Sequence, residues 1–264
     1  MELNDILYEK KEGIAVATFN RPAVLNAFRQ ATLREFISIL DDVKADHMVR
    51  VLIITGSGRA FSAGIDLKEM AYPSSETLSL KQTYDELQTI QDVTRHMVHL
   101  PKTIIAAVNG IAVGIGVETA LASDIRLAAD KATFAFTEVK RALFETNGVM
   151  YILPRLVGMG RAMQMLLTGE MVSAQDALNA GIVTRVVAQE QLMEYAIDMA
   201  HTIAANAPLS VRLVKQTMQK TYDLDLEAVM QLEVDGMMQC YRSEDLVEGF
   251  NAFLEKRPPV YKGK

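Results

Sequence analysis

Two glycine-bearing turns carry the residues best placed to do chemistry. Residues 56–58 (GSG) lead to residues 62–66 (SAGID), and residues 109–110 (NG) lead to residues 114–116 (GIG). Each turn follows an apolar run typical of a buried strand and precedes a helix, so backbone N–H groups can face an anion. Because two such turns occur, one donor from each can converge on a single oxygen atom. The pattern therefore predicts an oxyanion hole.

Two glutamates follow the second of these turns. Glu118 lies two residues after Gly116 among apolar neighbours, and Glu138 follows the apolar run at residues 133–136. A carboxylate in such surroundings loses hydration, which raises its pKa and suits it to act as a general acid or base. Taken alone, each glutamate also fits an ordinary charge at a helix start or a strand end.

Other kinds of site find less support in the sequence. Neither turn completes G-x-G-x-x-G, and no Gly-Lys-Ser or Gly-Lys-Thr occurs, so a nucleotide-binding loop is disfavoured. The formal net charge of -6 argues against a nucleic-acid partner, and the single cysteine, Cys240, excludes a disulfide framework and a cysteine-cluster metal site. His96 and His99 are spaced i, i+3 without a third ligand, so no metal is expected.

Alternating strands and helices must position these groups. Runs rich in β-branched and aromatic residues predict strands at residues 14–19, 51–55, 103–108, 125–128 and 133–136. Apolar positions at three- and four-residue steps predict helices around residues 33–43, across residues 79–100, and after Gly116. From Gln189 onward we expect helices only, with Pro208 in a first turn. This order is typical of the α/β class.

The 264 residues, half of them hydrophobic, are enough for a sizeable core. We predict a mixed α/β body over residues 1–200 and an all-helical tail over residues 201–264, whose methionines favour packing in a subunit assembly over ordinary core packing. The N-terminus has no secretory signal, and the longest apolar stretch, residues 103–117, is too short and too interrupted to span a membrane. We expect a soluble, cytoplasmic protein.

The chain resembles the enoyl-CoA hydratase/isomerase (crotonase) superfamily along nearly its whole length. The motifs that carry the likeness are NRP at 20–22, LNA at 25–27, ITG at 54–56, FSAGIDL at 61–67, AAVNG at 106–110 with Gly114 and Gly116, SDI at 123–125, LLTG at 166–169, SAQDA at 173–177, AGIV at 180–183 and AFLEKR at 252–257. The resemblance implies a spiral of ββα units closed by a helical C-terminal trimerisation region, in homotrimers or hexamers. It also implies an acyl-CoA thioester substrate and no cofactor, since CoA is part of the substrate.

The same resemblance assigns catalytic roles. The backbone N–H groups of Ile65 and Ile115 would hold the thioester oxygen as it gains enolate charge. Glu118 would activate the water that attacks C3, and Glu138 would deliver the proton to C2. Because the two carboxylates flank one water, their proximity separates their pKa values, and one can be ionised while the other carries a proton.

The resemblance also implies substrate contacts. In the family, backbone at Asn26, Ala27, Ala63 and Gly64 lies against the adenine and pantetheine. Basic residues near the phosphates match Arg59 and Lys68, for which a solvated surface charge is the rival interpretation. Phe253 and Lys256 match a pair that reaches the CoA of a neighbouring subunit. The expected substrate-binding set is completed by Asp66, Leu67, Gly114, Phe144 and Glu145.

Two departures from the family pattern leave the reaction open. Ile115 stands where members typically have glycine, so its β-branched side chain should narrow or redirect the acyl pocket. Glu145 lies close to where isomerases of the family place an acid, although it also fits a simple helix N-terminal charge. The primary hypothesis is hydration of a short or medium trans-2-enoyl-CoA. The alternatives are an enoyl-CoA delta-isomerase or other crotonase-type reaction using Glu138 or Glu145, and a non-catalytic acyl-CoA-binding or RNA-contacting member.

Overall fold

The computed structural model describes residues 3–69 and 80–264. Its larger sheet has six strands in the order β1 (Ile6–Lys11), β2 (Ile14–Phe19), β3 (Val51–Gly56), β5 (Thr103–Val108), β7 (Ile125–Ala129) and β10 (Arg185–Val187). β1 is antiparallel to β2, and the other neighbours are parallel. A second, smaller sheet contains β4 (Ala60–Ser62), β6 (Ile111–Val113), β8 (Thr133–Ala135) and β9 (Val172–Ser173). In this sheet only β8 and β9 pair antiparallel.

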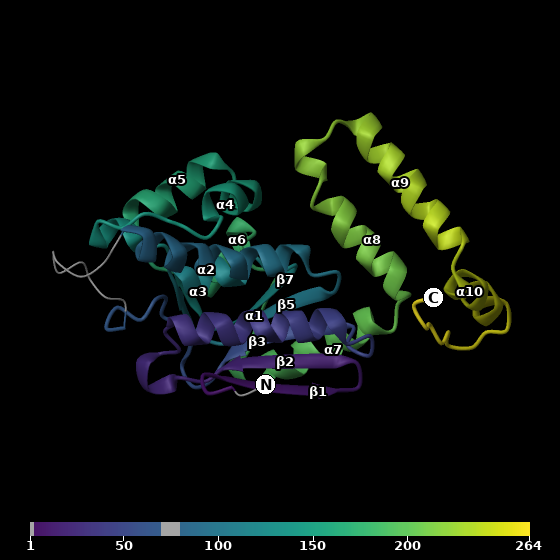
Figure 1. Ribbon diagram of the computed structural model, residues 1–264, viewed down its shortest axis with the longest axis horizontal. Coiled ribbons are helices and arrows are strands. Elements are labelled where there is room, and N and C mark those ends of the chain that lie inside the picture. The colour runs from purple at the N-terminus through teal and green to yellow at the C-terminus, as the bar shows by residue number, and fades with distance from the viewer. Residues whose placement is uncertain (1–2, 70–79) are drawn as a thin grey trace.

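Helices cover both faces of the larger sheet (Figure 1). Leu52 of β3 belongs to the core shared with α1 (Gln30–Ala45) and α2 (Leu80–His99). Val51, which points to the opposite face, belongs to the core shared with α7 (Leu192–Ala204). Because both faces are covered, the parallel strands are apolar throughout rather than alternating, and this is why they stand out in the sequence.

Shorter helices connect the two sheets and pack beside the smaller one. They are α3 (Ile115–Leu121), α4 (Val149–Val157), α5 (Met159–Thr168) and α6 (Ala174–Ala180), with single 3₁₀ turns η1 (Pro22–Val24), η2 (Glu138–Arg141), η3 (Gln189–Gln191) and η4 (Thr221–Asp223). Of these, α3 and η2 begin directly after strands of the smaller sheet. They therefore start at the carboxyl ends of β6 and β8.

The α/β prediction is confirmed, and so are the five predicted strands and the helical C-terminal part. The predicted helix over residues 79–100 is α2, although Ser79 lies outside the described residues. The helix expected after Gly116 already begins at Ile115. Strand β1 was not predicted, because an edge strand needs only one buried position. Ile6 is buried, whereas Glu9, Lys10 and Lys11 face solvent.

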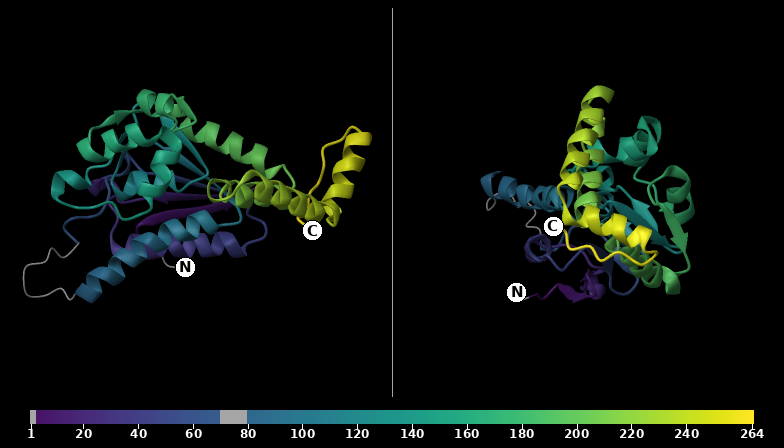
Figure 2. Two further views of the ribbon diagram at one scale, coloured as in Figure 1. Left: turned by 90° about the horizontal axis from the view of Figure 1, so that it is seen from above. Right: turned by 90° about the vertical axis from the view of Figure 1, so that its right-hand side faces the viewer.

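Three helices extend from the body as an arm (Figures 1 and 2). The arm comprises α8 (Pro208–Met218), α9 (Leu226–Tyr241) and α10 (Glu244–Leu254), and Pro208 occupies the first turn of α8 as predicted. Residue 200, the predicted boundary, lies within α7 on the sheet. Within residues 3–69 and 80–264, no helix combines the length and the apolar composition that crossing a bilayer requires.

The arm exposes many large apolar side chains. On α9 and α10 they include Leu226, Met230, Val234, Met237, Met238, Tyr241, Val247, Phe250, Phe253 and Leu254. Exposed apolar surface of this extent is typical of a surface that another molecule covers.

A buried lysine ties the arm to the body. The ammonium of Lys215 on α8 lies 2.8 Å from Asp124 Oδ2 and donates to the carbonyl oxygens of Lys102 at 2.9 Å and Met97 at 3.3 Å. Its side chain is only 7% exposed, and burial lowers its pKa although the charge of Asp124 opposes this. One turn further, Gln219 donates to the carbonyl of Val98 at 2.8 Å. The C-terminal end of α8 is thus held by polar contacts to α2, to the chain that follows α2 and to Asp124.

Replacing this lysine should lower the free energy of unfolding. Lys215→Ala leaves Asp124 partly buried without its cation, so we expect a loss of about 3 kcal/mol in the free energy of unfolding, measured by urea titration. The control is Lys220→Ala, which removes an exposed lysine and should cost less than about 0.5 kcal/mol. Equal losses in the two variants would show that the buried contact contributes nothing.

Candidate active site

The two glycine-bearing turns meet at one edge of the smaller sheet. We call residues 62–67 the first turn and residues 114–116 the second turn. β4, β6 and β8 are parallel neighbours, and their pairing ends at Ser62 with Ala112 and at Val113 with Ala135. The N–H of Gly114 donates to the carbonyl of Ala135 at 3.0 Å, which continues the pairing one residue further. The carboxyl ends of the three strands therefore bring residues 62–66, 113–116 and 135–138 together.

Close backbone packing of the two turns depends on glycine. Gly64 has a φ of +95°, and a Cβ added to it would lie 2.9 Å from the carbonyl oxygen of Val113. A Cβ on Gly116 would lie 2.5 Å from the carbonyl oxygen of Ser62. Any side chain at either position would push the turns apart. The spacing of glycines in the sequence thus reflects a contact between two backbones.

The two predicted oxyanion donors are both available. Ile115 is the first residue of α3, where helical N–H groups have no partner within the helix. Ile65 pairs with Phe28 in an isolated bridge that engages the carbonyl of Gly64 and the N–H of Asp66. In the part of the chain that the structure describes, neither the Ile65 nor the Ile115 N–H donates a hydrogen bond. The Ile115 side chain is buried in the main core.

The two predicted acid–base residues lie beside these turns. Glu118, on the first turn of α3, is 2% exposed, and its Oε1 has no hydrogen-bond partner among the described residues. Glu138 begins η2, and its buried Oε2 likewise has no partner within the described chain. A Cβ on Gly114, whose φ is +53°, would lie 2.4 Å from Glu138 Oε1. The absence of a side chain at this position makes room for the carboxyl group.

Glu145 brings a third carboxyl group to the same place. It is 5% exposed, and neither of its carboxyl oxygens has a hydrogen-bond donor among the described residues. Burial raises the pKa of Glu145, and its contacts with Glu118 and Glu138 raise it further. The sequence pointed to this residue by its resemblance to isomerases, but not to its contact with the two other glutamates.

Glu118 experiences opposing effects. Burial raises the pKa of Glu118 to about 7 and the charge of Glu138 adds to the rise, while the nearby carboxyl group of Glu145 and the N–H groups of Asn147 and Thr146 oppose it. The segment that starts at Glu145 therefore supplies three contacts to one carboxylate. Such a group can exist as a base near neutral pH and can take up a proton there.

Two buried asparagines fix the loop that leads into the first turn. Asn109 accepts from the N–H of Gly56 at 3.0 Å and donates to the carbonyls of Gly58 and Ala60. Asn26 also donates to the carbonyl of Ala60, at 2.7 Å, and adopts a positive φ of 56°. The prediction places the backbone of Asn26 at the substrate, and in the structure its side chain holds this loop.

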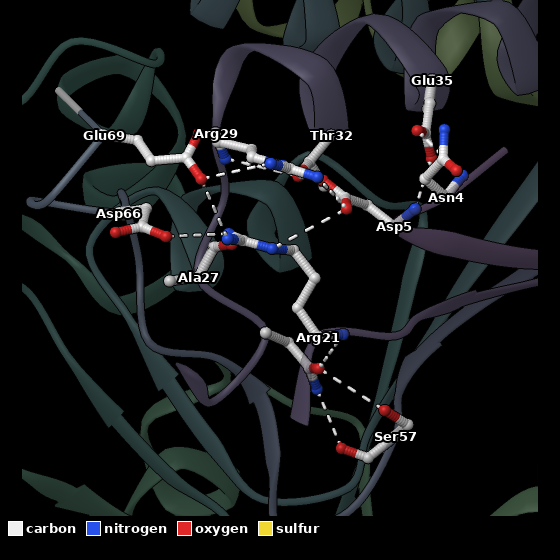
Figure 3. A network of polar contacts seen from close by, with 11 residues as sticks. Asn4, Asp5, Arg21, Ala27, Arg29, Thr32, Glu35, Ser57, Asp66 and Glu69 are labelled. Carbon is white, nitrogen blue, oxygen red and sulfur yellow. Dashed lines mark hydrogen bonds and ion pairs between the residues drawn. The ribbon is translucent and has the colours of Figure 1, made fainter. Parts of the chain in front are cut away.

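An ion-pair network holds Asp66, at the end of the first turn (Figure 3). Arg21 Nη1 lies 2.9 Å from Asp66 and donates to the carbonyl of Ala27 at 2.6 Å. Arg29 binds Asp5 through two nitrogens, at 2.7 and 2.8 Å. Burial alone would raise the pKa of Asp5, but its hydrogen bonds outweigh this and lower it. The sequence did not single out this network, although Arg21 lies in the NRP motif.

Comparison with known proteins identifies the family. A family model described as enoyl-CoA hydratase/isomerase matches residues 9–264. The chain belongs to the enoyl-CoA hydratase/isomerase family. It is 36% identical over 267 residues to the short-chain-enoyl-CoA hydratase of Clostridium acetobutylicum, with 97% of each chain covered, and 34% identical over 264 residues to the 1,2-epoxyphenylacetyl-CoA isomerase of Escherichia coli, with 98% of each covered.

A solved structure from this family has the same fold. The crystal structure of an enoyl-CoA hydratase from Bacillus anthracis superimposes with a TM-score of 0.94 at 36% identity, covering 99% of this chain and 100% of that one. The crotonase-type fold implied by the sequence motifs is therefore confirmed, including the helical C-terminal region.

The remaining predicted substrate-binding residues of this enoyl-CoA hydratase/isomerase family member divide by location. Ala63 and Leu67 lie half-buried in the first turn beside Gly64 and Asp66, whereas Arg59 and Lys68 are exposed next to that turn and lack a carboxylate partner within residues 3–69 and 80–264. Phe144 is 73% exposed beside Glu145.

The last two predicted contacts lie elsewhere. Phe253, 81% exposed, is on α10, and Lys256 follows that helix. In Figure 1, α10 at the end of the arm lies away from α3. A single chain therefore does not bring this pair to the carboxyl groups. Within the described ranges, no group of three His, Cys, Asp or Glu residues has an arrangement that could hold a metal ion.

Filling the space beside Glu138 should disrupt the site. Gly114→Ala forces a Cβ into contact with the Glu138 carboxyl group and strains a positive φ, so we expect at least a hundredfold lower kcat/KM for the reaction this site carries out. Gly160→Ala, where a Cβ meets nothing within 4 Å, is the matched control and should leave kcat/KM unchanged. Full activity in Gly114→Ala would contradict the assigned geometry.

The raised pKa of Glu145 should make stability depend on pH. The unfolded chain releases this proton near pH 4.5 while the folded chain keeps it, so folding binds a proton and stability falls as pH rises above about 4.5. Glu145→Gln removes the effect. Relative to that variant, the melting temperature of the natural chain should fall by about 3 °C per pH unit between pH 6 and 8, measured by calorimetry. Parallel curves would mean that Glu145 is ionised.

Proposed function

We propose that this protein is an enoyl-CoA hydratase that adds water across a short or medium trans-2-enoyl-CoA. The observation that supports this most directly is the convergence, at one strand edge, of two backbone turns with unengaged N–H groups and two glutamates with unpartnered carboxyl oxygens. Hydration needs both parts: a place for the negative charge that develops on the thioester oxygen, and two positions for protons.

The proposed reaction uses each group once. The N–H groups of Ile65 and Ile115 bind the thioester oxygen and stabilise the enolate. Ionised Glu118 takes a proton from a water molecule as the oxygen of that water bonds to C3. Protonated Glu138 gives its proton to C2. Return of the proton from Glu118 to Glu138 through a water molecule restores the starting state. Two carboxyl groups close enough for their charges to interact favour such a division, because they resist being ionised together.

Substrate binding is assigned to the residues around the first turn and to a neighbouring copy. The exposed Arg59 and Lys68 would pair with the CoA phosphates, since they have no carboxylate partner in the described chain. We propose that the apolar arm packs in a homotrimer or hexamer, where Phe253 and Lys256 reach the CoA of the next subunit. The division into a catalytic body, residues 1–200, and an assembly region, residues 201–264, remains a prediction. So does a cytoplasmic location.

One observation favours a second candidate. The position of Glu145 beside the other glutamates suits an enoyl-CoA isomerase, in which a single acid moves a proton between C2 and C4. The hydratase remains the primary proposal because Glu118 and Glu138 are both present at the turns. A non-catalytic acyl-CoA-binding protein would have no need of two buried glutamates there.

Hydration of crotonyl-CoA tests the proposal. The purified protein should hydrate it, and Glu118→Gln and Glu138→Gln should each lower kcat at least a hundredfold, because each removes an acid–base group. Glu170→Gln, at an exposed glutamate, is the control and should have full activity. No turnover by the natural chain, or full activity in both variants, would rule out the hydratase. Rapid conversion of a 3-enoyl-CoA that is lost in Glu145→Gln would establish the isomerase.

A further inference from the structure

The carboxyl group of Glu145 is surrounded in an unusual way. Its two oxygens are buried and lack a donor in the described chain, and the charged groups that act on it are Glu118 from α3 and Glu138 from η2. Helix α2 also packs here, but it contributes the uncharged Gln91 and Thr94, which hold the segment through Thr146 and Asn147. Among the described residues, Glu145 thus has no contact with the cation that would normally balance a buried carboxylate.

This arrangement requires a proton. A buried polar atom without a hydrogen bond is costly, and two ionised carboxylates in contact repel each other strongly. A single proton on one carboxyl group removes both costs, since its O–H then donates to the neighbouring carboxylate. Charge-assisted hydrogen bonds of this kind are among the stronger ones in proteins.

The surroundings decide which glutamate holds the proton. The N–H groups of Thr146 and Asn147 lie near Glu118 and favour its ionised form. Glu138 is only half-buried. Glu145 is buried and has neither kind of support. The proton shared between Glu145 and Glu118 therefore belongs on Glu145, and the proton that Glu138 delivers in the proposed hydration is a separate one.

We propose that Glu145 is a positioning residue that stays a neutral carboxylic acid and donates its O–H to Glu118. This contact orients the Glu118 carboxylate, keeps it ionised, and leaves its unpartnered Oε1 for the attacking water. The role in catalysis rests on the proposed hydratase function, whereas the protonation of Glu145 does not. The high pKa of Glu145 agrees with it.

Carbon-13 NMR of protein labelled at the glutamate carboxyl carbons tests the protonation directly, without substrate. The signal that disappears in Glu145→Gln should keep the chemical shift of a protonated carboxyl up to at least pH 8. A second signal, identified by its loss in Glu118→Gln, should titrate at higher pH in Glu145→Leu than in the natural chain. A Glu145 signal that titrates near the ordinary value of about 4.5 would overturn the proposal.

The pH profile of kcat/KM for crotonyl-CoA tests the positioning role. In Glu145→Leu, Glu118 loses its donor, so the acidic limb should move up by about one pH unit, a tenfold loss at low pH that largely recovers at high pH. In Glu145→Gln the amide N–H replaces the lost donor, and the limb should stay in place. Glu170→Leu, at an exposed position, is the matched control.

The outcomes separate the two proposals. A loss of kcat/KM that is the same at every pH in Glu145→Leu would mean that Glu145 only fills space. So would a shift of the acidic limb in Glu145→Gln equal to that in Glu145→Leu. If the natural chain does not hydrate crotonyl-CoA, the function is wrong, and the NMR titration still decides the protonation state. Should Glu145→Leu fail to fold, the shift of the Glu145 signal in the natural chain remains decisive, with Glu145→Gln as the reference.

Discussion

The site depends on one close contact between two stretches of backbone. At Gly64 and Gly116, main-chain atoms of the first and second turns approach to distances that exclude any side chain. The three-residue strands β4, β6 and β8 are long enough to place these turns side by side and to end together. Because the donors are main-chain N–H groups, their positions follow from the backbone path and are insensitive to side-chain rotation.

Three acidic side chains, Glu118, Glu138 and Glu145, lie beside this backbone contact. The carboxyl groups of buried Glu118 and Glu145 and half-buried Glu138 lie together, and within the described chain none of them forms an ion pair with a Lys or Arg. The apolar surroundings that make the body stable also make this arrangement unfavourable unless a proton is shared. A folded protein keeps such a feature at the expense of stability, and functional sites are where such features are found. Two arginines close to the first turn pair with aspartates instead: Arg21 with Asp66, and Arg29 with Asp5.

The sequence revealed the parts of the molecule whose signal is local. Strands buried on both faces appear as apolar runs, and glycines at tight turns stand out by type, so the α/β class and the two turns could be predicted. Strand β1 could not be predicted, because the exposed Glu9, Lys10 and Lys11 leave the segment without the apolar pattern of a strand. Strands β4, β6 and β9 have three residues or fewer, too short for any period to show. Nor could the contact of Glu145 with Glu118, since it joins positions on different elements through a fold that only the whole chain defines.

The network in Figure 3 links the site to the edge of the larger sheet. Asp5 immediately precedes β1, and its carboxylate holds Arg29 and lies 3.7 Å from Arg21 Nε, which connects it to Asp66 in the first turn through the Arg21–Asp66 ion pair. Edge strands pair on one side only and open more easily than central ones. A brief separation of β1 would release Asp5 from Arg29 and weaken the support of Asp66 while the remainder of the protein stays folded. Local opening of this edge, rather than global unfolding, would then set how much of the time the turn is correctly formed.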